Sequence, residues 1–233
     1  MNGLQGILRG NAGLFLMLIP PMLLSMYAQF KVKSTFAKYS KIGNSKGISG
    51  AQAAKFLLQH NGINDVSIAQ VAGSLSDHYD PRGKVLRLSE PVHSIKSISA
   101  VGVAAHETGH AIQDQKHYGP LVLRSTLVPV ANIGSSAGPY ITIIGLFAGI
   151  PLLTQIGIVL FAGAVLFYLV TLPVEFDASH RALKQLEANA ILTDEEMKGA
   201  RKVLTAAALT YVASALTAMV NLARLVIMSR RRR

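Results

Sequence analysis

Some residue types that would define a reaction class are missing from this chain of 233 residues. It contains no cysteine, so disulfide bonds, thiolate zinc sites and cysteine nucleophiles are excluded. Tryptophan is also absent, and no nucleic-acid-binding motif is present, so no nucleic-acid partner is expected. Charged residues make up only 15% of the chain, against roughly 25% in soluble domains. A simple soluble globule is therefore excluded.

Three long stretches of the chain carry no charge at all. Residues 10–30 and 203–223 each form a run of 21 such residues, and residues 125–174 form a run of 50. About 20 apolar residues cross a bilayer core, so these runs predict one, one and two membrane spans. The first run exceeds the apolar part of a signal peptide and lacks an A-x-A-like cleavage site, so we expect a retained anchor. Asn221 and Arg224 make the last run a weaker span.

Two helices are predicted in the water-facing region of residues 31–124, between the uncharged runs 10–30 and 125–174. Ser49 and Gln52 form a capping box that begins a helix over about 50–60, and Asn61-Gly62 ends it. A second helix is expected from Ile98 to about Gln115, where apolar positions recur at helical spacing.

A small sheet is predicted between these two helices. Residues 66–71 alternate apolar and polar side chains, as in a half-buried strand. Residues 75–80 and 84–89 flank Pro81-Arg82-Gly83, which predicts a hairpin. The region is therefore expected to combine helices with a small antiparallel sheet.

The most informative motif is His106-Glu107-Thr108-Gly109-His110, on the second predicted helix. Positions i and i+4 lie on the same helix face, so the two imidazoles can meet one cation. Glu107 follows about 100 degrees around the helix, where it can take a proton from water and give it to a leaving amine. Two imidazoles and a carboxylate suit zinc. We predict that His106 and His110 are ligands of one Zn²⁺ per chain and that Glu107 is the catalytic base. The alternative without a function is that the motif consists of two histidines on a helix surface and a structural glutamate.

A catalytic zinc also needs a third protein ligand. The extended pattern with a third histidine fails, because Lys116 stands at that position and His117 lies one residue too far along. Two spans over 125–174 would return the chain to the side of the motif helix, and Glu175 is the first charged residue after them. An acidic residue beside the acyl boundary normally has a partner, so Glu175 is the preferred third ligand. The competing candidates are Asp177, His180 and Glu187.

Three segments also resemble a known family: Asp77-His-Tyr-Asp-Pro81, Val103-Ala-Ala-His-Glu-Thr-Gly-His-Ala-Ile-Gln113 and Pro173-Val-Glu-Phe-Asp-Ala-Ser179. They resemble the YugP-like membrane zinc metallopeptidases of bacteria over nearly the whole chain, including the order of spans. The resemblance implies zinc-dependent peptide hydrolysis at a membrane. It also implies Glu107 as base, with His106, His110 and Glu175 as metal ligands.

A more distant resemblance is to HtpX-type membrane proteases, whose ligand segment reads Glu-x-x-Ala-Asp. Ala178 keeps the fourth position, but Ser179 replaces the aspartate that would orient a metal-bound imidazole. Asp177 or another acceptor is expected to take that role. In such enzymes an exposed strand can pair with an extended substrate, which would bring Asp77 and His78 near the cleft. A hydrogen-bonded turn at the sheet edge accounts for these two residues equally well.

The predicted fold class is an α+β membrane protein with about four transmembrane helices, a surface zincin-like helix and a small antiparallel sheet. Its predicted parts are an N-terminal membrane anchor (1–30), a zincin-like catalytic region with the HExxH helix (31–124), two transmembrane helices (125–174), a third-ligand segment (175–202) and a C-terminal membrane helix with a basic tail (203–233).

The basic residues predict the orientation of the chain. Lysine and arginine residues flanking the spans on the zinc side are in excess, so the positive-inside rule favours a cytoplasmic catalytic region at a bacterial inner membrane. Arg9 and Arg230–Arg233 count against this orientation.

The expected function is that of a membrane-bound zinc-dependent endopeptidase acting on unfolded or membrane-associated polypeptide. Two alternatives stay open. One is a non-catalytic membrane protein with a structural zinc site, which predicts a fourth protein ligand. The other is a hydrolase that uses the same site on a different bond.

Overall fold

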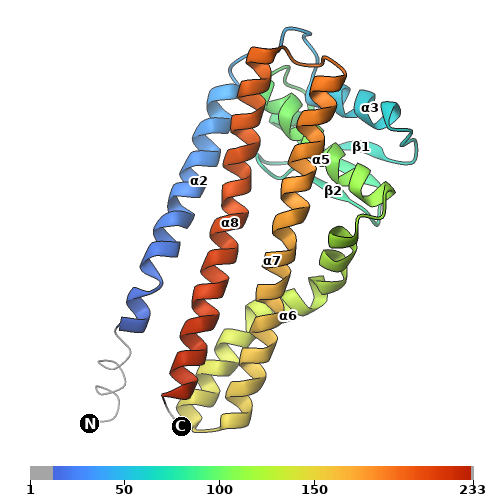
Figure 1. Cartoon of the computed structure of the whole chain (residues 1–233). Helices are drawn as coiled ribbons and strands as arrows, with labels where there is room; N and C mark the ends of the chain where they lie inside the picture. The colour runs from blue at the N-terminus through green and yellow to red at the C-terminus, as the bar shows by residue number, and fades with distance from the viewer. Residues whose placement is uncertain (1–12, 232–233) are drawn as a thin grey trace. The chain divides into compact units, whose positions relative to one another are not determined.

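The computed structural model describes residues 13–231, most of which are helical (Figure 1). Within that range, four helical segments are long and apolar enough to cross a membrane: Gly13–Tyr39, Gly119–Ala148, Pro151–Ala188 and Asp194–Arg230. Together with a three-stranded sheet they confirm an α+β membrane protein. Residues 1–12 of the predicted anchor, with Arg9, and the last two arginines of the predicted tail lie outside the described residues.

The chain divides into two compact units, each built from segments that are distant in sequence. The apolar unit comprises Met1–Ala28, Leu123–Leu172 and Thr210–Arg233. The motif unit comprises Gln29–Val122 and Pro173–Leu209. Both units receive residues from the four long helices, which are α2 (Ile19–Tyr39), α6 (Gly119–Ala148), α7 (Pro151–Ala188) and α8 (Asp194–Arg230).

Local signals account for the shorter helices of the motif unit. Helix α3 (Gly50–His60) begins at the predicted capping box: the Ser49 hydroxyl accepts from the Gln52 backbone N–H, and the Gln52 side chain accepts from the Ser49 N–H. It ends at Asn61, and Gly62 follows in the left-handed conformation, with φ +69°. Both predicted ends of this helix are confirmed.

Helix α5 (Ile98–Gln115) carries the motif and has the predicted bounds. Ser97 caps its first turn by accepting from the Ala100 N–H. Two clusters of buried apolar side chains include α5 residues, one with α3, α7 and α8 and the other with α2, α3 and the sheet. The motif helix is therefore the central element of this unit. The structure adds one short helix that was not predicted, α4 (Glu90–His93).

The sheet has the strand order β1 (Ser67–Val71), β3 (Val85–Ser89), β2 (His78–Asp80). The hairpin prediction is confirmed, since β2 and β3 pair antiparallel. The prediction of a wholly antiparallel sheet is wrong, because β1 pairs with β3 in parallel. The chain reverses once before β2 and again at the hairpin, so β3 runs in the direction of β1 and lies between the other two strands. The sheet is therefore mixed.

In the apolar unit, α6 and α7 pack closely on glycines. A Cβ at Gly134 would lie 2.1 Å from the Leu160 carbonyl oxygen, and one at Gly145 would lie 2.5 Å from the Thr154 nitrogen. Because glycine has no side chain, the backbones of the two helices can come into van der Waals contact at these positions. The turn between α6 and α7 lies at Gly149 and Ile150. Pro151 begins α7, because a proline at the first helical position loses no hydrogen bond there.

Candidate metal centre

Two helices of the motif unit bring the predicted site residues together. Helix α5 carries His106, Glu107 and His110, and α7 carries Glu175. Gly109 lies against α7, where a Cβ would stand 2.5 Å from the Ala178 carbonyl oxygen. Because a larger residue would push the helices apart, this glycine lets the motif helix approach the segment that carries Glu175.

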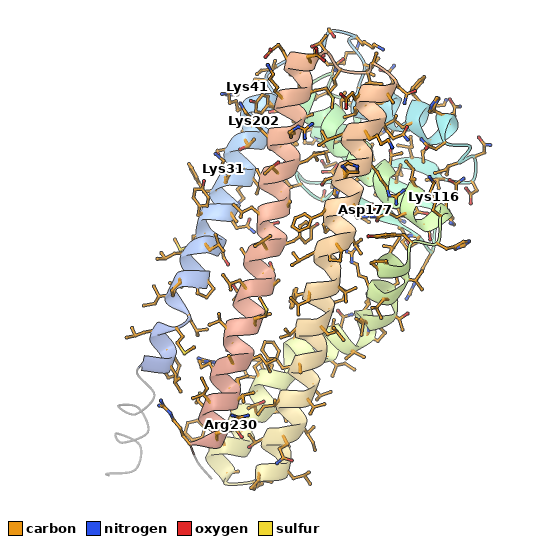
Figure 2. All side chains as sticks on the ribbon, viewed as in Figure 1. Lys31, Lys41, Lys116, Asp177, Lys202 and Arg230 are labelled. Carbon is orange, nitrogen blue, oxygen red and sulfur yellow. The ribbon has the colours of Figure 1, made fainter. Side chains whose placement is uncertain are left out.

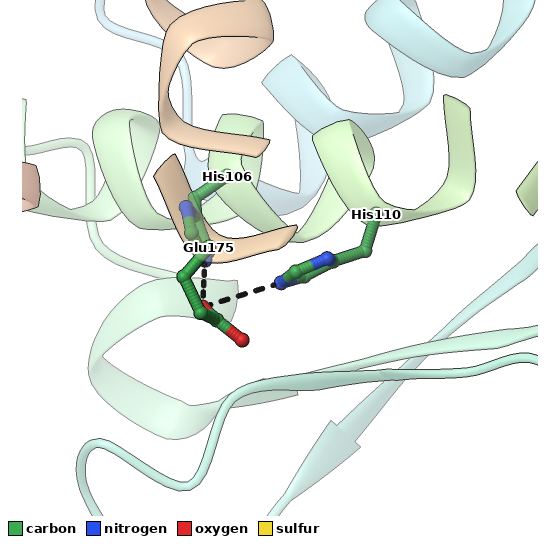
Figure 3. Close-up of side chains that lie close together, drawn as sticks. All are labelled: His106, His110 and Glu175. Carbon is green, nitrogen blue, oxygen red and sulfur yellow. Dashed lines mark hydrogen bonds and ion pairs between the residues drawn. The ribbon is translucent and has the colours of Figure 1, made fainter. Parts of the chain in front are cut away.

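The side chains of His106, His110 and Glu175 converge on one point (Figure 3). The His106 Nε2 lies 3.3 Å from the Glu175 Oε2, and the His110 Nε2 lies 3.6 Å from the same oxygen. The two imidazole rings are nearly perpendicular, at 85°, with their centroids 4.8 Å apart. The Glu175 side chain is only 2% exposed, so its carboxylate faces the two rings and not solvent.

This donor set fits a zinc ion. Zinc binds imidazole nitrogen and carboxylate oxygen at about 2.0–2.2 Å in tetrahedral geometry, so bound ligand atoms lie about 3.4 Å apart. The two separations between an imidazole Nε2 and the Glu175 Oε2, 3.3 and 3.6 Å, fall at that spacing, and all the ligand atoms lie within 4.8 Å of one another. Within residues 13–231, the group that could hold an ion consists of these three residues. Three protein ligands are the number found in catalytic zinc sites, whereas structural sites have four.

Each imidazole is held through its other nitrogen. The His106 Nδ1 lies 3.1 Å from the Ser179 hydroxyl, and the His110 Nδ1 lies 3.0 Å from the Gln113 Oε1. The Gln113 amide can point only one way, because its Nε2 donates to the Val174 carbonyl oxygen at 2.8 Å. Its oxygen therefore accepts from the Nδ1–H of His110. This leaves the His110 Nε2 with a free lone pair toward Glu175, as a metal ligand requires.

Asp177 contributes to this network from one step further out. Its carboxylate accepts from the Gln113 Nε2 at 2.7 Å and pairs with the Arg181 guanidinium. Asp177 was expected to orient an imidazole in place of the aspartate missing at position 179. The structure puts Ser179 itself beside His106, and Gln113 beside His110. Sequence reasoning missed Gln113, although its place three residues after His110 puts both on one helix face.

Comparisons with known proteins agree with this geometry. A family model described as "Putative neutral zinc metallopeptidase" matches residues 14–230. The chain belongs to this family. It is also 50% identical over 203 residues to "Putative membrane protease YugP" of Bacillus subtilis (strain 168), covering 87% of this chain and 90% of that protein. No solved structure matches the chain. The resemblance to YugP-like membrane zinc peptidases is thereby confirmed, and the chain is a membrane protein.

In this member of the zinc metallopeptidase family, Glu107 lies next to the cluster on α5. The residue is 7% exposed, and its side chain forms no hydrogen bond within residues 13–231. Burial raises the pKa of Glu107 above its usual value, and the charges of His106 and His110 partly oppose that shift. A carboxylate that is not engaged elsewhere is available to exchange a proton at the site.

The other candidate residues lie apart from the three-residue group. The competing ligands Asp177, His180 and Glu187 are not part of the three-residue group. Asp77 accepts from both the backbone N–H and the hydroxyl of Ser89, at 2.7 and 2.9 Å. Burial raises the pKa of Asp77, and the hydrogen bonds from Ser89 oppose the shift. His78 is exposed at the start of β2. Asp77 thus has the hydrogen-bonded turn position that the sequence allowed.

Proposed function

We propose that this protein is a membrane-bound zinc-dependent endopeptidase with one Zn²⁺ per chain. His106 and His110 hold the ion through Nε2, and Glu175 holds it through its carboxylate. The observation that carries the proposal is the convergence of these three donors: both imidazoles lie 3.3–3.6 Å from one Glu175 oxygen, and all the ligand atoms lie within 4.8 Å of one another. Membership of the zinc metallopeptidase family supports it.

The side chains around the proposed zinc ion have separate catalytic and positioning roles. The bound ion supplies Lewis acidity toward the scissile carbonyl and toward water. Glu107 accepts the proton of the attacking water and later donates it to the leaving amine nitrogen as the C–N bond breaks. Ser179 and Gln113 hold the two rings so that their Nε2 atoms face the ion. No covalent intermediate with the protein is needed.

The proposed substrate is an unfolded or membrane-associated polypeptide, cleaved at the cytoplasmic side of a bacterial inner membrane. The motif unit carries basic residues on the long helices α2 and α8 and on the loops beside the helices, including Lys31, Lys41, Lys116 and Lys202 (Figure 2). Positive charge near span ends favours the cytoplasmic side. Because the chain has no cysteine, a single cysteine at position 41 can be labelled selectively in cells with an impermeant maleimide. Labelling of intact cells at this position would contradict the orientation.

The test of the catalytic role is the variant Glu107→Gln, which keeps the shape of the side chain but removes the base. We expect full zinc occupancy and a loss of roughly 10²–10⁴-fold in cleavage of an unfolded polypeptide. Glu187→Gln, which removes an exposed carboxylate on α7, is the matched control and keeps both zinc and activity.

Other results of the same assay separate the alternatives. Unchanged cleavage by Glu107→Gln would contradict the proposed base. A zinc-loaded wild-type protein that cleaves no polypeptide but hydrolyses another bond would contradict the peptidase assignment. A zinc-loaded protein without any hydrolase activity would favour a structural zinc site.

A further inference from the structure

A buried arginine in the apolar unit has no ionic partner within residues 13–231. Arg224, on α8, is 8% exposed, and its guanidinium carbon lies 5.1 Å from the centroid of the Phe15 ring. Within residues 13–231 its side chain forms no hydrogen bond or ion pair, and its Nε is buried without an acceptor. The Oδ1 of Asn221 is likewise buried without a donor. The two residues are three positions apart, so they lie on the same face of α8.

The segments of this unit contain no acidic side chain. All 12 acidic residues of the chain belong to the motif unit. The segments of the apolar unit contain seven arginines and no Asp or Glu. No carboxylate side chain of this unit can therefore neutralise Arg224. Ionisable side chains within spans are normally paired or functional, because an uncompensated charge there is unfavourable.

The position of Arg224 along α8 indicates the level of lipid headgroups. It lies six residues before Arg230 at the C-terminal end of this helix (Figure 2), or about 9 Å along the axis. Phe15 is 48% exposed and covers the guanidinium from one side. A guanidinium that lies over an aromatic ring can still donate hydrogen bonds in its own plane, and the planar arrangement of its N–H groups matches the oxygens of a phosphate group.

The two unsatisfied atoms also differ in kind. Arg224 presents a donor and Asn221 presents an acceptor, so a ligand that satisfies both carries a hydrogen-bond acceptor and a hydrogen-bond donor. The positive charge of Arg224 favours an anionic acceptor. A phosphate diester next to a hydroxyl group has both. The headgroup of phosphatidylglycerol is such a ligand, and it would lie at the level of a span end.

We propose that Arg224 and Asn221 form a binding site for the headgroup of an anionic phospholipid. Arg224 donates to the phosphate oxygens, and Asn221 accepts from a headgroup hydroxyl. The site involves none of the residues proposed to bind zinc. The lipid-binding proposal can therefore be tested independently of the proposed peptidase activity.

The experiment uses the full chain, purified and delipidated in an uncharged detergent and titrated with phosphatidylglycerol or phosphatidylcholine. Native mass spectrometry measures the bound lipid. We expect wild-type protein to bind one phosphatidylglycerol in preference to phosphatidylcholine. Arg224→Leu should weaken that binding by about tenfold or more, and Asn221→Leu should weaken it to a smaller degree. Arg230→Leu removes an exposed arginine from the same helix and should stay within about twofold of wild type.

Three results would overturn the proposal. Equal binding by wild type and Arg224→Leu would exclude this arginine. An equal loss in Arg230→Leu would mean that only the general positive charge attracts the lipid. Displacement of the lipid by inorganic phosphate at equal concentration would identify a site for the free ion. If Arg224→Leu does not fold, Arg224→Lys replaces it: this variant keeps the charge but lacks the planar fork, and undiminished binding would equally overturn the proposal.

Discussion

The motif unit and the apolar unit treat their buried polar groups in opposite ways. In the motif unit, the Nδ1 atoms of His106 and His110 have the neighbours Ser179 and Gln113. In the apolar unit, the Nε of Arg224 and the Oδ1 of Asn221 have no partner in the described part of the chain. The first arrangement fixes the side chains before a ligand arrives, whereas the second leaves polar atoms for a molecule from outside to satisfy.

The units also differ in the sign of the charge they offer. The motif unit has all of the acidic residues and presents a carboxylate between two imidazoles, which suits a cation. The apolar unit has arginine as its sole charged side chain, which suits an anion. The comparison therefore predicts two ligands of opposite charge. Variants can test each side of it.

The largest effect is expected from Glu175→Ala, which removes the carboxylate that both imidazoles face. Two neutral imidazoles alone hold zinc weakly, so bound zinc should fall from about one ion per chain to below about a tenth. Metal analysis of the purified protein measures this. Glu187→Ala removes a competing candidate on the same helix and should keep its zinc. Retained zinc in Glu175→Ala would instead point to Glu187 or His180 as the third ligand.

The next effect concerns the glycines on which helices of both units pack. A methyl group at Gly109 would meet the Ala178 carbonyl oxygen, and one at Gly134 would meet that of Leu160. Gly109→Ala and Gly134→Ala should each lower the free energy of unfolding by about 1–3 kcal/mol. Only Gly109→Ala should also weaken zinc binding, because it separates α5 from α7 at the site. Gly119→Ala, where a Cβ meets nothing within 4 Å, is the control.

Thermal unfolding and zinc titration of the same three variants separate the two effects. An equal loss of zinc affinity in Gly134→Ala would contradict the assignment of each glycine to its own unit. It would mean that general destabilisation, and not the local α5–α7 contact, governs metal binding.

Local patterns in the sequence predicted much of this fold. The ends of α3 depend on Ser49, Gln52 and Gly62, which act within a few residues of one another. The motif histidines are four residues apart on one helix, so their common face follows from helix geometry. The nearness of Glu175 followed from counting the spans between it and the motif. That Glu175 is a ligand stays a prediction, as does the catalytic role of Glu107.

Features that depend on contacts between distant segments could not be predicted. The direction of β1 depends on which strand lies next to it, and the spacing of its residues does not encode that neighbour. The partner of each imidazole depends on how closely α5 approaches α7, which brings Ser179 and Gln113 into reach. Arg224 looked from the sequence like a weakness of the last span. That its Nε lacks a partner among residues 13–231 could be found only from the packing around it.

A smaller effect is expected from Gln113→Leu, which removes the acceptor beside His110. Without it the His110 ring can carry its proton on Nε2, the atom that must bind the metal, so zinc affinity should fall by about 10–100-fold. Competition with a chelator of known affinity measures this fall. Gln115→Leu changes the same residue type at an exposed position of α5 and should leave the affinity unchanged. Wild-type affinity in Gln113→Leu would show that the ring needs no such partner.

The smallest effect is expected on the hairpin, where a polar network lies at the surface. Asp80 accepts from Arg87 at 2.7 Å and from the backbone N–H groups of Arg82 and Gly83. The hydrogen bond from Arg87, helped by the one from Gly83, lowers the pKa of Asp80 from 3.8 to about 2. Because the pKa is lower in the folded state, ionised Asp80 stabilises the fold above about pH 4. That contribution is lost as the pH falls toward about 2.

The expected signature is a difference in Tm between wild type and Asp80→Asn that is small at pH 5 and vanishes on acidification. It is small because the half-exposed pair is screened by solvent, unlike the buried network around His110. Asp65→Asn removes an exposed carboxylate without a hydrogen bond in the described chain, and controls for the change in net charge. A difference that grows as the pH falls would reverse the sign of the linkage and contradict the role of Arg87.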